Sequence, residues 1–302
     1  MPNNILITGG SGFIGSELMA RWLAEQHQLY VLTRKPDKLM RRWQQYSGQV
    51  HAFSRFADLK ATKLDWIINL SGEGIADRPW TSRRKQQLLD SRIDVTNQLA
   101  SWLRHHDMTV PVIISGSAIG IYGDCGLNSV DEGAVLAHQD FAASLCQQWE
   151  QSAMQLEEHC QRLVLVRTGI VLGKSGGMLK RLLLPFSLAL GGRLGDGQQG
   201  FSWIHMEDYC RAIQHLLLND QSSGVYNLVA GDEINNQQFT RALATVLRRP
   251  AFMHVPSLLL KVLLGELSDL LLTGQKVKPM RLKSEGFGFV YPDINVALRD
   301  LC

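Results

Sequence analysis

The chain has 302 residues, of which 45% are hydrophobic and 20% are charged, an ordinary composition for a globular protein. This length predicts one large α/β domain, alone or with a smaller appended lobe. The net charge of +3 is small for the length, and it argues against a nucleic-acid partner, because such partners require a concentrated basic surface.

No signal peptide precedes the first apolar segment, and no apolar run reaches the roughly 18 to 20 residues that span a bilayer. We therefore expect a cytoplasmic protein without a membrane partner. The five cysteines are scattered and form no C-x-x-C pair. They are interpreted as reduced thiols, and neither the cysteines nor the histidines show the clustering of a metal site.

Strand and helix patterns alternate through the first 170 residues. In chain order, the sequence predicts a strand at 5–8, a helix at 15–25, a strand at 29–33, a strand at 66–70, a helix at 81–104 capped by Thr81, a strand at 112–115, a helix at 141–160 and a strand at 163–168. This alternation predicts a doubly wound parallel sheet of the Rossmann type. Ligands of such sheets bind at the carboxyl ends of the strands.

Beyond residue 170 the pattern loosens into glycine-rich loops at 173–200, followed by a strand at 224–227 and a helix at 236–248. The apolar segment 255–272 is interrupted by charges, which predicts an amphipathic helix packed on the core. We therefore predict a dinucleotide-binding domain over 1–170, to which late strands and helices return from 200–230. A smaller substrate-side lobe with a C-terminal helical segment is predicted over 171–302.

A glycine-rich segment follows the first predicted strand and opens the first predicted helix. It reads Thr8-Gly-Gly-Ser-Gly-Phe-Ile-Gly15. A pyrophosphate must approach the backbone N–H groups of a helix N-terminus, and larger side chains would block it. The alternative is a tight turn without a ligand. The predicted pyrophosphate-binding residues are Gly9, Gly10, Ser11, Gly12, Phe13, Ile14 and Gly15.

The second predicted strand ends in Leu32-Thr33-Arg34-Lys35, without an acidic residue. NAD sites of this type place an acid there for the ribose 2′-hydroxyl, whereas arginine can bind a 2′-phosphate through charge-assisted hydrogen bonds. Arg34 therefore predicts a preference for NADP(H) over NAD(H). The alternative is an exposed basic turn.

Further segments resemble consecutive signatures of one protein family. They are Asn69–Glu73, Ile75–Asp77, Trp80–Thr81, Asp90–Arg92, Arg167–Gly173, Leu190–Gly192, Trp203–Asp208, Thr273–Val277 and Tyr291–Pro292. With Thr8–Gly15 they resemble the extended short-chain dehydrogenases/reductases, and within these the atypical "epimerase family protein" subgroup with its C-terminal domain of unknown function. The resemblance extends over nearly the whole chain.

The resemblance implies which further residues contact the cofactor. Thr33 and Arg34 would meet the adenosine 2′-phosphate. Leu70 and Ser71 would lie beside the ribose, followed by Gly72 and Glu73. Arg92 and Val171 would also line the site; the alternative for Arg92 is a salt bridge on a helix surface. The resemblance likewise implies that His205 and Asp208, which suggest a catalytic pair, have a structural role.

The departure from the family concerns catalysis. Active members use a serine or threonine after the fifth strand and a Tyr-x-x-x-Lys helix, whose lysine lowers the tyrosine pKa. Ser117 matches the serine, but Phe141 and Leu145 stand where the tyrosine and lysine are expected. The candidates for proton transfer are Ser117 and then Tyr122, with Glu73 as a further acid or base; each has a purely structural alternative.

Two classes of function remain open. The first is an NADP(H)-dependent oxidoreductase or epimerase with a small, sugar-like substrate. The second is an NADP(H)-binding sensor or scaffold without turnover, which the missing tyrosine and lysine favour. The substrate is not specified by the sequence. A homodimer through helices 81–104 and 141–160 is the default expectation by analogy with relatives.

Overall fold

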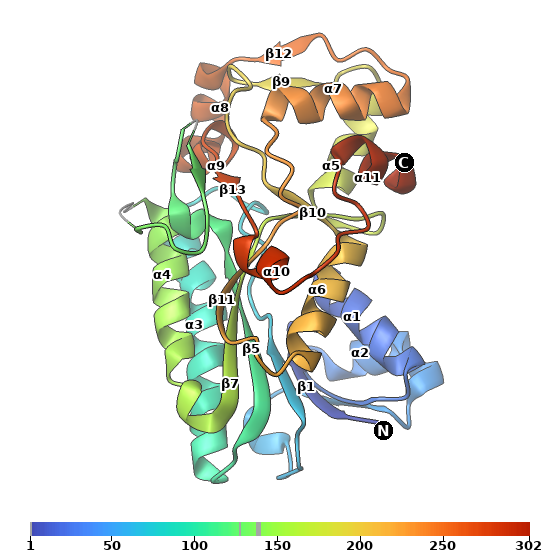
Figure 1. Cartoon of the computed structure of the whole chain (residues 1–302), viewed down its shortest axis with the longest axis vertical. Coiled ribbons are helices and arrows are strands. Elements are labelled where there is room, and N and C mark those ends of the chain that lie inside the picture. Colours follow the sequence, from blue (N-terminus) through green and yellow to red (C-terminus); the bar gives the residue numbers. More distant parts are fainter. Residues whose placement is uncertain (1, 127, 137–139) are drawn as a thin grey trace.

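The computed structural model describes residues 2–126, 128–136 and 140–302. Its centre is a seven-stranded sheet in which every neighbouring pair is parallel (Figure 1). From edge to edge the strands are β11 (Gly224–Leu228), β7 (Cys160–Thr168), β5 (Val110–Ala118), β4 (Trp66–Asn69), β1 (Asn4–Thr8), β2 (Gln28–Leu32) and β3 (Val50–Phe53). The strand order reverses between β1 and β4, as in dinucleotide-binding sheets. The predicted Rossmann-type α/β fold is confirmed.

Helices cover both faces of the sheet, so its strands are apolar on both sides. Ile5 and Ile7 of β1 point into one core, and Leu6 points into the other. The first core is covered by α1 (Phe13–Ala24), α2 (Pro36–Arg42) and α6 (Met206–Leu218), the second by α3 (Ser82–His105) and α4 (Phe141–Met154).

The helix ends test the predicted boundaries. Thr81 caps α3 as predicted, because its hydroxyl oxygen accepts a hydrogen bond from the Arg84 N–H at 3.2 Å. The predicted helix over 141–160 is too long, since α4 ends at Met154. Cys160 already belongs to β7, where it pairs with Val110 of β5, and a residue in that ladder cannot continue a helix.

A second group of elements forms a lobe above the carboxyl ends of the strands (Figure 1). Its core includes Trp203, Phe239 and Leu298. Its elements are β8 (Ile170–Leu172), α5 (Gly177–Ser187), β9 (Gly192–Leu194), β10 (Trp203–His205), α7 (Asn236–Leu247), β12 (Met253–Val255), α8 (Ser257–Leu264), α9 (Asp269–Leu272) and α11 (Ile294–Leu301). Within the predicted glycine-rich loops over 173–200, Gly192–Leu194 form strand β9, which pairs with β12.

Short elements connect the lobe to the sheet. β6 (Ser129–Val130) pairs with β13 (Lys276–Val277), and α10 (Met280–Ser284) follows β13. The 3₁₀ helices are η1 (Gln44–Tyr46), η2 (Phe56–Asp58), η3 (Ile119–Tyr122), η4 (Glu157–His159) and η5 (Gly265–Ser268).

The segment 255–272 differs from its prediction. It is broken at Gly265, which has a φ of +56°, into α8, η5 and α9. In α8 Leu260 alone is buried, whereas Leu258 and Val262 are exposed, so the prediction of one core-packing helix is wrong. A periodic apolar pattern does not reveal whether a face meets protein or solvent. Across the described residues, every helix is too short or too polar to cross a membrane.

Candidate functional site

In the loop between β1 and α1, glycines allow neighbouring backbone segments to pack in direct contact. Gly9 has a φ of +74°, and a Cβ there would lie 2.4 Å from the Leu70 carbonyl oxygen. A Cβ at Gly15 would lie 2.3 Å from the Gly9 carbonyl oxygen. Gly12 is the exposed N-cap of α1 and has an extended backbone. The first N–H groups of α1 lack acceptors within the helix, and this end of the helix can therefore hold an anion such as pyrophosphate.

A buried hydrogen-bond chain ties the ends of β1 and β4 together. The Thr8 hydroxyl donates to Asn69 Oδ1 at 2.7 Å and accepts from the Ser71 N–H at 3.1 Å. The Asn69 amide in turn donates to the Thr96 hydroxyl at 2.8 Å. Leu70 and Ser71 are thereby fixed beside the glycine-rich loop, where the resemblance places the cofactor's ribose.

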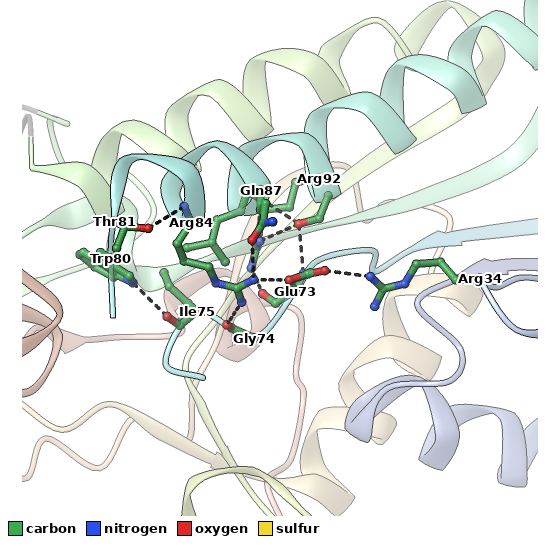
Figure 2. Close-up of polar contacts among 11 residues, drawn as sticks. Arg34, Glu73, Gly74, Ile75, Trp80, Thr81, Arg84, Gln87 and Arg92 are labelled. Carbon is green, nitrogen blue, oxygen red and sulfur yellow. Dashed lines mark hydrogen bonds and ion pairs between the residues drawn. The ribbon is translucent and has the colours of Figure 1, made fainter. Parts of the chain in front are cut away.

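Two arginines from different elements meet one carboxylate (Figure 2). Arg34, just past β2, has an 86% exposed side chain, and its Nη1 lies 2.8 Å from Glu73 Oε1. Arg84 of α3 is only 6% exposed and donates to Glu73 Oε2 and, at 2.9 Å, to the Gly74 carbonyl. Arg84 first, and then Arg34, hold the pKa of Glu73 below its usual value.

Arg92 lies buried behind the same loop. A Cβ at Gly72 would be 2.9 Å from the Arg92 Cζ, so a larger residue there would require the guanidinium to shift. Arg92 donates to the carbonyls of Leu88 and Glu73 at 2.9 and 3.0 Å, and its guanidinium lies 5.0 Å from the Trp149 ring centroid. Burial lowers the pKa of Arg92. The alternative of a surface salt bridge is wrong, because within the described residues this buried cation has no carboxylate partner.

A cavity of about 460 Å³ opens between these groups. Its lining residues are Arg34, Gly72, Glu73, Gly74, Asp77, Arg78, Arg84 and Gln87. Three arginines thus face two carboxylates, and Asp77 is already paired with Arg181 of α5. Arg78 has no ion-pair partner in the part of the chain that the structure describes. This charge balance favours an anionic ligand.

The remaining cofactor candidates lie on the same edge of the sheet. Thr33 is buried directly after β2, and its hydroxyl accepts from the Lys35 N–H at 3.4 Å. Val171 of β8 shares a core with Phe13 of the glycine-rich loop. The structure therefore places the predicted residues at the ends of β1, β2 and β4, with Arg92 added from α3 and Val171 from β8.

The two predicted catalytic residues belong to one buried polar network. The Ser117 hydroxyl donates to Glu150 at 2.6 Å. Arg167 donates to both Glu150 oxygens at 2.8 and 2.9 Å and to the Tyr122 hydroxyl oxygen at 3.0 Å. Tyr122 in turn donates to Asn227 at 2.8 Å. Ser117 and Tyr122 are buried, and burial is the main cause that raises the pKa of Tyr122.

Sequence reasoning missed the two residues at the centre of this network, Glu150 and Arg167. In the parallel pairing of β5 with β7, Ser117 lies opposite Arg167. The predicted strand over 112–115 ends before Ser117, and the sequence does not give the register between strands, so this neighbour could not have been predicted. The roles of Ser117 and Tyr122 in proton transfer stay predictions.

The positions expected to hold tyrosine and lysine are both packed. The Phe141 ring meets the Trp80 ring edge-on, with 4.9 Å between their centroids, and Lys85 Nζ lies 5.0 Å from the Phe141 centroid. Lys85 is ion-paired with Glu266 of η5. Leu145 is buried in α4. Neither position offers an acid or a base.

His205 and Asp208 hold the lobe in place. The His205 Nδ1 accepts from the Glu207 N–H at 3.0 Å, and its ring stacks on Tyr291 with centroids 3.8 Å apart. Asp208 accepts from the N–H groups of Val290 and Tyr291, each at 2.8 Å. These contacts fasten α6 to the C-terminal segment and give both side chains a structural role.

The switch point of the sheet, the glycine-rich loop at a helix N-terminus and the arginine-lined cavity together define a Rossmann-type nucleotide-binding protein. The profile of the NAD dependent epimerase/dehydratase family matches residues 5–229, and that of a domain of unknown function, DUF1731, matches residues 255–301. The chain belongs to the NAD dependent epimerase/dehydratase family, and the resemblance found in the sequence is confirmed.

Similar proteins cover almost the whole chain. The epimerase family protein MT2273 of Mycobacterium tuberculosis is 37% identical over 97% of this chain and 96% of its own length. The crystal structure of human epimerase family protein SDR39U1 with NADPH is 30% identical, with a TM-score of 0.88 over 99% of this chain and 98% of that chain. The nucleoside-diphosphate sugar epimerase from Corynebacterium glutamicum is 28% identical, with a TM-score of 0.76 over 100% of this chain and 58% of that chain. This chain is accordingly an NAD(P)-binding protein with the extended short-chain dehydrogenase/reductase fold.

Proposed function

We propose that this chain is an NADP(H)-binding oxidoreductase or epimerase that acts on a small, sugar-like molecule. The observation that carries the cofactor preference is Arg34, an exposed cation at the end of β2, where an NAD site places an acid. Arg78 and Arg84, which line the same cavity, add to the positive charge there. The NADPH bound to the human relative supports the same choice.

In this proposal different elements of the fold bind different parts of the cofactor. Gly9 to Gly15 hold the pyrophosphate at the N-terminus of α1, and Thr33 and Arg34 meet the 2′-phosphate. The loop Leu70–Glu73 lies beside the ribose. Arg92, a buried cation that lacks a carboxylate partner among the described residues, and Val171 complete the site.

The cofactor preference is tested with Arg34→Ala. The lost charge-assisted contact should weaken NADPH binding by about tenfold or more, corresponding to roughly 1.5 to 3 kcal/mol, and leave NADH binding unchanged. Arg55→Ala is a matched control, because Arg55 is also exposed and also paired with one carboxylate, Asp58. Equal affinities of the wild type for NADPH and NADH would refute the preference.

The proposed reaction class is hydride transfer. An epimerase of this kind removes a hydride from a carbon atom, inverts that carbon and returns the hydride, with the cofactor supplying the chemistry. The sugar-like substrate rests on the nucleoside-diphosphate sugar epimerase among the similar structures. Residues 1–170, joined by 200–230, would bind the cofactor, and the lobe over 171–302 would bind the substrate.

A second candidate function is an NADP(H)-binding sensor or scaffold without turnover. Phe141 and Leu145 favour it, because neither side chain can transfer a proton. The two functions are separated by assaying NADPH oxidation with a panel of carbonyl compounds and, because an epimerase returns its hydride and leaves the cofactor unchanged, by measuring epimer formation from nucleotide sugars in the presence of NADP⁺. If turnover exists, Ser117→Ala or Tyr122→Phe should lower it by about 10²- to 10⁴-fold without weakening NADPH binding. Absence of turnover across the panel, with tight NADPH binding, would favour the sensor.

A further inference from the structure

We propose that Glu73 sets how strongly this chain prefers NADP(H) over NAD(H), because its carboxylate and the cofactor's 2′-phosphate compete for Arg34. The inference rests on the proposed NADP(H) preference and adds the residue that limits it. Glu73 would act as a specificity determinant that never binds the phosphate itself.

The first step is that Glu73 is fixed in place. Its N–H donates to the Ser91 hydroxyl at 3.1 Å, and its carbonyl accepts from Arg92 at 3.0 Å. Its carboxylate is held by Arg84, which is buried and also anchored to the Gly74 carbonyl (Figure 2). Contacts from α3 therefore hold both the backbone and the side chain of Glu73.

The second step is that Arg34 is free to move. Its side chain is 86% exposed, and Glu73 is its one ion-pair partner within the described residues. An exposed ion pair of this kind contributes on the order of a two- to fivefold factor in an equilibrium. A phosphate beside the cavity can therefore draw Arg34 away, but the contact with Glu73 must be given up or shared.

The third step is that Glu73 acts on the two cofactors in opposite ways. A 2′-phosphate is an anion, so the Glu73 carboxylate repels it as well as occupying its arginine. NAD(H) carries a 2′-hydroxyl instead. This hydroxyl does not need Arg34, and it can donate a hydrogen bond to a carboxylate. Glu73 therefore weakens NADP(H) binding and does not weaken NAD(H) binding.

Glu73→Gln is the sharpest substitution for testing this. A glutamine keeps the shape and an amide oxygen that can accept from Arg84, while Arg84 keeps its bond to Gly74. Lowering the pH to neutralise Glu73 is not an equivalent test. The pKa of Glu73 is held below its usual value by Arg84 and Arg34, whereas a phosphate monoester gains a proton near pH ~6 and would lose charge first.

The experiment measures dissociation constants for NADPH, NADH, 2′,5′-ADP and 5′-AMP with wild type, Glu73→Gln, Arg34→Ala and the double variant. In Glu73→Gln the preference for NADPH over NADH, and for 2′,5′-ADP over 5′-AMP, should rise about two- to fivefold. The rise should vanish when Arg34 is already alanine. Glu207→Gln is the matched control. Glu207 of α6 also forms an ion pair with one arginine, Arg21 of α1, at 2.6 Å, and its substitution should change neither ratio.

The outcomes separate this inference from the proposed function. If the wild type does not discriminate between the cofactors, the proposed function's preference fails and this inference fails with it. If Arg34→Ala abolishes a clear preference but Glu73→Gln leaves or lowers it, this inference alone is overturned. Should Glu73→Gln fail to fold, Glu73→Asp replaces it. Its shorter side chain cannot span both arginines, so Arg34 is released, and a rise smaller than that expected for Glu73→Gln should follow because the negative charge stays.

Discussion

Two clusters on the carboxyl side of the sheet are built from the same chemical groups and differ in burial. At the end of β2, Arg34 is 86% exposed and meets a single carboxylate, Glu73. Beside α4, Arg167 is 5% exposed and forms an ion pair with Glu150, which is 12% exposed. Glu150 also accepts a hydrogen bond from the Ser117 hydroxyl. The exposed arginine can exchange its partner for a ligand, whereas the buried pair cannot part without leaving a charge unpaired in the interior.

This difference in burial suits the exposed cluster to ligand binding and the buried cluster to a structural role. Exposed ion pairs contribute about 0 to 1 kcal/mol, so their arginines are available for recognition. Removing one member of a buried pair costs about 3 to 5 kcal/mol, so its residues are held in one arrangement. The cofactor end is therefore adaptable, and the network that contains Ser117 and Tyr122 is rigid.

The largest expected effect is on stability and comes from Glu150→Gln. The glutamine leaves buried Arg167 without a compensating charge, and the free energy of unfolding should fall by about 3 to 5 kcal/mol in urea denaturation. Glu207→Gln removes a half-exposed pair with Arg21 and should cost no more than about 1 kcal/mol. Equal losses in the two variants would show that burial does not distinguish these ion pairs.

Leu145→Lys should be nearly as damaging. Leu145 is buried in α4, so the substitution removes its packing and brings an ammonium group into an apolar site. We expect a loss of about 3 kcal/mol in the free energy of unfolding, measured in urea. The standard tyrosine and lysine therefore cannot be restored by two simple substitutions. A fully stable variant would show that this position can open to solvent.

At the cofactor end of the molecule, Gly12→Val should abolish cofactor binding in a folded protein. The Gly12 backbone is extended, and a Cβ there would lie 3.2 Å from the Gly9 carbonyl oxygen, a contact that a shift of a few tenths of an ångström relieves. The fold should therefore accept a side chain that the pyrophosphate does not. We expect NADPH affinity to fall by at least about 100-fold, or about 2.7 kcal/mol, by fluorescence titration.

Gly15→Val is the matched control for that loss. Its Cβ would lie 2.3 Å from the Gly9 carbonyl oxygen, within packed backbone, so this variant should lose its fold as well as its ligand. Circular dichroism distinguishes the two variants. Normal NADPH binding by Gly12→Val would mean that the pyrophosphate lies elsewhere.

The features predicted correctly from the sequence depend on residues close together in the chain. The glycine-rich loop, the Thr81 cap and the position of Arg34 at a strand end each follow from a few neighbours. The partner of Arg34 did not follow, because Glu73 is 39 residues away and reaches it only through the pairing of β1 with β2 and β4.

The wrong and missing predictions concern contacts between segments that are not neighbours in the chain. Apolar periodicity reports that a helix has an apolar face, and it does not report what covers that face, as Leu258 and Val262 of α8 show. The end of α4 was placed too late because the chain must turn after Met154, through η4, to enter β7 at Cys160, where the ladder with β5 begins. The Glu150–Arg167 pair was missed since side-chain geometry between two elements has no local signature.

The smallest effect is expected from Phe141→Tyr, and it sharpens the comparison at the rigid end. The ring would keep its edge-on contact with Trp80 and its place beneath Lys85, so the free energy of unfolding should change by no more than about 1 kcal/mol. Phe141→Leu, which lacks an aromatic ring, should lose more, because both contacts require one. NADPH oxidation should not increase in Phe141→Tyr, since Leu145 cannot supply the charge that lowers a tyrosine pKa. A tenfold gain in turnover would instead show that Lys85, or another cation near Phe141, serves that purpose, and that the site is one substitution away from the family's usual chemistry.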